Sequence, residues 1–115
     1  MTDIEQWEAG YRKGFAKPII LQILHDEGVS YPYKLTKQIS KWTNGLLTMA
    51  TSNIYPVLKS LKDDGLVHER GEKERKVMYG LTNEGLAFLD ELQESLAKFL
   101  TTMLAAFSTS RGEEA

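Results

Sequence analysis

Small polar side chains stand together at Thr51, Ser52 and Asn53, at the start of a segment with helical apolar spacing. Hydroxyl and amide groups both donate and accept hydrogen bonds, so this cluster is suited to contacts with a polar partner. At about 100° per residue, Lys59 falls opposite the apolar stripe and Tyr55 falls beside that exposed face. We therefore take these five residues as a candidate binding surface.

A second candidate group is cationic and comprises Lys73, Arg75 and Lys76. These residues lie in or directly after the segment GEKER, which separates the apolar runs LVHER and KVMYGL. Residues 76–81 alternate between larger apolar and other side chains, which is the period of a half-buried strand. The pattern predicts a two-stranded β-ribbon with a cationic tip.

Residues suited to catalysis or metal binding do not form a recognisable set. The chain has no cysteine, which excludes disulfides and thiolate chemistry. His25 and His68 are far apart in the sequence, and Ser95 and Lys98 match a Ser-x-x-Lys pattern only within a helical segment that lacks the partner motifs. We expect no enzymatic activity, no metal site and no cofactor.

The elements that position these residues are mostly helical. Apolar spacing and breakers predict helices at 3–13, within 15–28 and within 31–45, a fourth that begins near 50–52 and ends at Gly65, and a long one at 83–107. Thr48 or Thr51 is expected to cap the fourth helix, and Thr82 the last. The segment 108–115 reads as a flexible tail.

Charge is distributed unevenly along the chain. The net charge is −2, yet residues 31–81 hold nine Lys and Arg against five Asp and Glu. A basic middle between acidic ends indicates a local cationic surface of the kind that binds nucleic acid. No apolar run approaches the roughly 18 residues of a membrane span, and the amino terminus does not resemble a signal peptide, so we expect a cytoplasmic protein without a membrane partner.

Short helices followed directly by a β-ribbon predict a mainly α fold with a two-stranded β wing, the winged helix-turn-helix. We place it at residues 14–82, after an amino-terminal amphipathic helix at 1–13. In this fold the second helix of the pair enters the DNA major groove, so double-stranded DNA is the expected partner. Lysines at 34, 37 and 41 recur at helical spacing in the preceding helix and fit either phosphate contact or an ordinary solvated face. The expected DNA contacts are Lys34, Thr51, Ser52, Asn53, Tyr55, Lys59, Lys73, Arg75 and Lys76.

The long helix at 83–107 carries apolar residues at alternating steps of three and four, the heptad pattern of helix pairing. At about 1.5 Å per residue it would be roughly 37 Å long, more than a small core can cover. We therefore predict a homodimer through this C-terminal dimerisation helix, with the amino-terminal helix packed against the same region. The expected contact residues are Ile4, Trp7, Tyr11, Leu89, Leu92, Leu96, Phe99 and Met103.

Three segments resemble the PadR family of transcriptional regulators. They are SYPYKLTKQI, NIYPVLKSLKDDGLV with its Tyr-Pro pair, and RKVMYGLTNEG, and together the resemblance covers roughly residues 18–90. It implies a homodimer that binds a palindromic operator, usually as a repressor, and the short carboxy-terminal part resembles the small-member branch. Tyr31-Pro32 stands where the family commonly has His-Gly, and Ala50 and Ser52-Asn53 replace its usual residues at the front of the fourth helix.

Two interpretations remain open from the sequence. A winged-helix adaptor that binds proteins and not DNA is the rival function, although it would need neither the cationic tip nor the small polar helix front. Trp7, Trp42 and Phe99 are compatible with a small aromatic effector site at the dimer interface, as the resemblance allows, or with ordinary packing.

Overall fold

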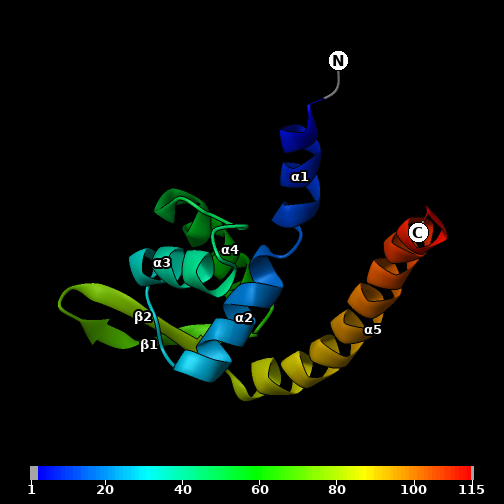
Figure 1. Ribbon diagram of the computed structural model, residues 1–115. Coiled ribbons are helices and arrows are strands. Elements are labelled where there is room, and N and C mark those ends of the chain that lie inside the picture. Colours follow the sequence, from blue (N-terminus) through cyan, green and yellow to red (C-terminus); the bar gives the residue numbers. More distant parts are fainter. Residues whose placement is uncertain (1–2, 115) are drawn as a thin grey trace.

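The computed structural model describes the backbone of residues 3–114 and the side chains of residues 3–108. Within this range the elements follow the order α1 (Ile4–Lys13), α2 (Ala16–Glu27), α3 (Pro32–Trp42), α4 (Thr51–Asp63), β1 (Val67–Lys73), β2 (Lys76–Leu81) and α5 (Asn83–Glu114) (Figure 1). The order and type of these elements agree with the sequence prediction. Met1, Thr2 and Ala115, which belong to the predicted first and last segments, lie outside the described residues.

The core forms where α2, α3 and α4 pack together with the start of α5. Its fully buried side chains come from the predicted apolar stripes: Ile20, Leu21 and Ile23 on α2, Leu35 and Ile39 on α3, Ile54, Leu58 and Leu61 on α4. Because one face of α4 is committed to this core, its opposite face is directed away from the protein. The core therefore fixes which residues of α4 can meet a partner.

The antiparallel β-ribbon extends further than the sequence suggested. β1 continues through Gly71 to Lys73, and the turn consists of Glu74 and Arg75 alone, so the prediction of a GEKER turn is wrong. Both turn residues have positive φ, 53° and 67°, as a two-residue type I′ hairpin requires. The register shifts between Glu69 and Glu72, where two β1 residues face one β2 residue. Such a bulge increases the local twist of the ribbon.

The root of the ribbon is tied to the loop between α2 and α3 and to the core. Ser30, which lies between α2 and α3, exchanges backbone hydrogen bonds with Tyr79, with N···O distances of 3.0 and 2.7 Å. Tyr79 and Leu81 pack against the core, while Gly80 lies beneath the side chains of Val29 and Arg70. Only the outer part of the ribbon therefore projects as a wing (Figure 1).

The helix α5 begins with the predicted cap, because Gly85 N donates to Thr82 Oγ1 at 2.9 Å. The backbone of Gly85 passes so close to Leu66 that a β-carbon at position 85 would overlap the Leu66 carbonyl oxygen. Leu89 is 2% exposed and belongs to the protomer core. Its assignment as a dimer contact is therefore wrong. The helix continues to Glu114, so the segment predicted as a flexible tail from residue 108 is mostly helical.

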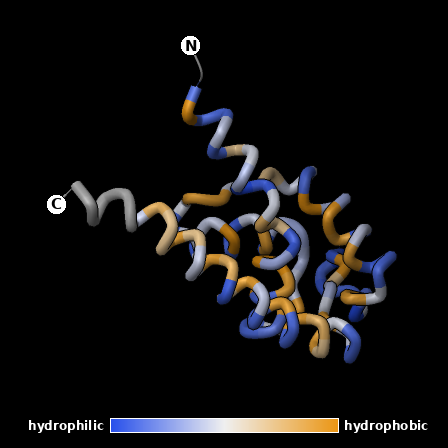
Figure 2. Tube along the Cα trace, turned by 90° about the vertical axis from the view of Figure 1, so that its right-hand side faces the viewer, coloured by the Kyte–Doolittle hydropathy of each residue, from blue (hydrophilic) through white to orange (hydrophobic). Residues whose placement is uncertain are grey.

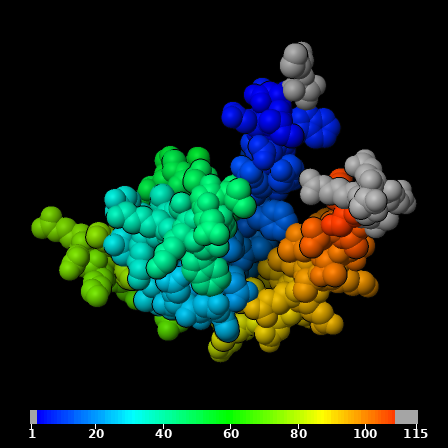
Figure 3. Space-filling model, viewed as in Figure 1, coloured from blue at the N-terminus to red at the C-terminus, as the bar shows by residue number. Residues whose placement is uncertain are grey.

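Two elements project from the packed body, namely α1 and the outer half of α5 (Figure 3). No side chain of α1 is buried. Apolar residues continue along α5 beyond the point at which it leaves the core (Figure 2). Exposed apolar side chains on these two elements include Ile4, Trp7, Tyr11, Phe99, Leu100, Met103, Leu104 and Phe107.

Candidate nucleic-acid interface

The front of α4 presents backbone amides and small polar side chains together. Ala50 occupies the N-cap position, and no side chain caps the helix there, so the predicted caps Thr48 and Thr51 are both wrong. The Thr51 hydroxyl instead lies 3.2 Å from the Thr36 hydroxyl on α3. Asn53 N donates to the Ala50 carbonyl at 2.9 Å. Because Ala50 has no side-chain acceptor, the amides of Thr51 and Ser52 remain available to an external oxygen such as that of a phosphate.

The exposed face of α4 carries the remaining predicted contacts. Ser52, Asn53 and Lys59 are exposed, and Tyr55 is 56% exposed. Lys59 Nζ lies 2.9 Å from Asp63 Oδ2, and both side chains are well exposed. Such a surface pair contributes little to stability, so an anionic partner can compete for the lysine at small cost.

The tip of the wing concentrates positive charge. Lys73 and Lys76 lie directly opposite each other in the ribbon, and Arg75 occupies the turn between them. Like charges in facing positions destabilise a ribbon, and a bound anion would relieve that repulsion. Among the described residues, neither Lys73 nor Arg75 forms an ion pair with an acidic side chain.

Tyrosines at the front of α3 join this surface, and the sequence prediction did not include them. Lys76 Nζ lies 4.5 Å from the centre of the Tyr31 ring and 3.4 Å from its hydroxyl. Lys37 Nζ lies 4.7 Å from the centre of the Tyr33 ring, and Tyr33 is 54% exposed. Lys34 is also exposed on this turn. The two tyrosines on either side of Pro32 were the available signal, because proline at the first helical position marks the start of α3.

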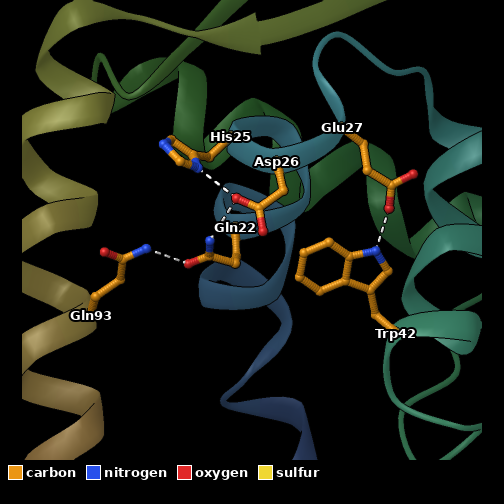
Figure 4. A network of polar contacts seen from close by, with 6 residues as sticks. All are labelled: Gln22, His25, Asp26, Glu27, Trp42 and Gln93. Atoms are coloured by element: carbon orange, nitrogen blue, oxygen red, sulfur yellow. Dashed lines mark hydrogen bonds and ion pairs between the residues drawn. The ribbon is translucent and has the colours of Figure 1, made fainter.

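Polar contacts fix α2 relative to α3 and α5, and thereby position the interface (Figure 4). The Glu27 carboxylate accepts from the Trp42 indole N–H and from Gln38, and these hydrogen bonds lower the pKa of Glu27. Gln38 in turn accepts from Ser30, whose backbone pairs with β2. This network links the end of α2 to both α3 and the wing.

A second chain of contacts joins α2 to α5. Gln93 Nε2 donates to Gln22 Oε1 at 2.7 Å, and Gln22 Nε2 donates to Asp26 Oδ1 at 3.0 Å. His25 Nδ1 lies 2.6 Å from the same carboxylate oxygen, and this contact is the largest cause of the lowered pKa of Asp26 (Figure 4). His25 therefore pairs with a neighbouring acid within α2.

An apolar pocket of about 400 Å³ lies between α2, the α3–α4 loop and α5. Phe15, Ile19, Leu47, Leu92 and Leu96 are among the side chains that line it. None of the three aromatic residues predicted for an effector site lines this pocket. Trp42 is instead held by Glu27, and Trp7 and Phe99 are exposed on separate helices, so the effector site remains a prediction.

The chain has the architecture of a winged helix-turn-helix protein. It has three packed helices, a helix pair whose second member has an exposed polar front, and a β-ribbon directly after that pair. The chain belongs to the transcriptional regulator PadR-like family, whose model matches residues 20–91. This result confirms the resemblance found in the sequence. The family consists of transcriptional regulators and not of enzymes, which agrees with the expected absence of catalysis.

Known proteins share both sequence and fold with this chain. Transcriptional regulator YqjI of Escherichia coli K12 is 34% identical over 83 residues, which is 72% of this chain but 40% of the length of YqjI. A transcriptional regulator from Clostridium thermocellum is 27% identical, with a TM-score of 0.70 over 79% of this chain and 88% of the other. Bacillus subtilis PadR in complex with operator DNA is 32% identical, with a TM-score of 0.58 over 67% of this chain and 45% of the other.

Among the described residues, no helix combines the length and apolar character needed to cross a membrane.

Proposed function

We propose that the protein is a sequence-specific DNA-binding transcriptional regulator, a cytoplasmic repressor that binds a palindromic operator as a homodimer. The observation that carries this proposal is the exposed polar front of α4 beside a cationic wing tip. The similarity to Bacillus subtilis PadR, whose structure was solved with operator DNA, supports it over 67% of the chain.

The recognition helix of this complex is α4. With its core face buried, the helix can lie in the major groove so that Ser52 and Asn53 reach base edges. Thr51, Tyr55, Lys59 and Lys34 are arranged around this front and are assigned to phosphate or groove-edge contacts. The wing approaches the flanking backbone with Lys73, Arg75 and Lys76.

The homodimer is supported by the apolar side chains that the protomer leaves exposed on α1 and α5. Trp7 is 66% exposed, Phe99 54% and Phe107 70%, although they lie on helices with continuous apolar spacing. A second copy that covers these faces would remove them from water, which is the main driving force of association. Two recognition helices related by the dimer axis would enter successive major grooves about 34 Å apart, and the operator would be an inverted repeat.

Two variants test which side chains read the sequence. Replacing both Lys73 and Arg75 by Ala removes two charges per protomer, or up to about four phosphate contacts per dimer. The slope of log K against log salt should then shrink by up to about 3.6, and affinity should fall on all sequences alike. Asn53→Ala should instead relax preference at particular base pairs and leave the slope nearly unchanged, because a base contact releases no counterion.

The measurement is a gel-shift titration at two salt concentrations or more, on duplexes recovered by selection from genomic fragments. Parental affinity, preference and slope in both variants would refute the assignment of this surface. Absence of DNA binding by the parent would favour the alternative of a protein-binding adaptor. A reporter gene placed behind the selected operator then separates repression from activation.

A further inference from the structure

A groove of about 890 Å³ lies between the α1–α2 junction and α4, and Asn53 is the one proposed DNA contact among its lining residues. Its lining includes Lys13 and Lys17 on one wall, Thr48 and Met49 in the preceding loop, and Asn53 and Pro56 on α4. Asn53 and Pro56 are exposed residues of the recognition helix. The groove therefore opens directly onto the face assigned to DNA.

The charge of this groove is positive. Among the residues that line it, as far as the structure is described, none is acidic, and Arg12, Lys13 and Lys17 are cationic. Arg12 is paired with Glu8, with an Nη2···Oε2 distance of 2.8 Å. Lys17 Nζ donates to the Ser60 hydroxyl of α4 at 2.7 Å, a neutral partner that leaves its charge uncompensated. Lys13 and Lys17 thus supply the net positive charge beside α4.

Lys13 and Lys17 lie on a different side of α4 from the wing. Lys62 faces the ribbon, because its Nζ lies 2.7 Å from Glu69 Oε2 on β1. Ser60 lies about 160° away from Lys62 around the helix, at about 100° per residue, and it contacts Lys17. The wing and the α1–α2 junction therefore flank α4 on different sides (Figure 1).

A helix in the major groove has a phosphate backbone on each side, because the groove is about 12 Å wide and bounded by both strands. The wing supplies cations on the side of α4 that Lys62 faces. We propose, building on the DNA-binding function above, that Lys13 and Lys17 contact the phosphates of the second strand that borders the groove. The hydrogen bond to Ser60 holds Lys17 beside α4 before DNA arrives, so less side-chain freedom is lost on binding.

The test uses the double variant Lys13→Gln and Lys17→Gln in the full chain, on a duplex that the parent selects from genomic fragments. Glutamine removes the charge and keeps a hydrogen-bond donor on an unbranched side chain. Up to about four phosphate contacts per dimer are lost, so the salt slope should shrink by up to about 3.6 with base preference unchanged. Hydroxyl-radical footprinting should lose protection on one strand of each half-site while the protection due to the wing persists.

Matched variants separate charge from structure. Arg at both positions should keep the parental slope. Lys98→Gln on α5 removes one charge, as each single Gln variant does, but away from α4, and it should leave the slope unaltered. Melting curves identify any variant that fails to fold, and in that case the Arg pair and the footprint of each single Gln variant decide. A parental slope and footprint in the double Gln variant would overturn this inference and leave the proposed function standing. A parent that does not bind DNA would overturn both.

Discussion

Truncation of Phe99 provides a quantitative test of the proposed dimer. Its side chain is 54% exposed in the protomer, so a second copy can bury about half of it. Full burial of a Phe side chain contributes about 1.5–3 kcal/mol, which gives about 0.8–1.5 kcal/mol per protomer for this half. Because the dimer contains two copies, Phe99→Ala should weaken association by about 1.5–3 kcal/mol, or about 10- to 100-fold in Kd.

The assay is sedimentation velocity over a dilution series, with Tyr33→Ala as the matched control. Tyr33 is also aromatic and 54% exposed, but it lies on α3, where Lys37 stacks on its ring. We expect the control to dimerise like the parent and to lose DNA affinity instead. The assignment of α5 fails if Phe99→Ala has the parental Kd, or if the control weakens the dimer equally.

Two further predictions concern the fold that supports the interface. Gly85→Ala should destabilise the protein by about 2 kcal/mol or more, because the new β-carbon meets the Leu66 carbonyl. As the control, the new β-carbon of Gly10→Ala in α1 meets no atom within 4 Å, so this variant should be neutral or slightly stabilising. Urea unfolding of both variants distinguishes local packing from helix propensity. The pKa of Glu27 is lowered by the hydrogen bond from Trp42, so its contribution to stability is present above the ordinary Glu value of about 4.3 and is lost as pH falls through the lower folded value. The Glu27→Gln variant should therefore lose less of its free energy of unfolding than the parent does between neutral and acidic pH. Equal losses would show that this contact does not cause the loss of stability at acidic pH.

The helices were predictable because their apolar spacing and their breakers are local signals. Pro32 begins α3 and Gly28 follows α2, and proline and glycine are the usual signals at these two positions. The wing was less predictable, since a turn of Glu74 and Arg75 contradicts the usual preference for Asn and Gly at positive φ. Only the pairing of Lys73 with Lys76 across the ribbon reveals where the strand ends.

The candidate site shows the same division between local and tertiary information. The exposed face of α4 followed from helical periodicity, whereas Leu89 satisfied the heptad pattern and is nevertheless buried within its own protomer. Periodicity states which side chains share a face but not which neighbour covers that face. The contact between Lys17 and Ser60 joins residues 43 positions apart, and no sequence pattern predicted it.

The length of α5 has a mechanical consequence for the proposed dimer. With 32 residues at about 1.5 Å each, the curved helix is about 48 Å long along its axis (Figure 1). If its outer half is clamped by a second copy, about 24 Å of helix separates the clamp from the winged-helix end, so a pivot of about 10° there would move that end by about 4 Å, comparable with the 3.4 Å rise of one base pair. A slight repacking of the proposed dimer contact on α5 would thus change the half-site spacing that the two recognition helices can span.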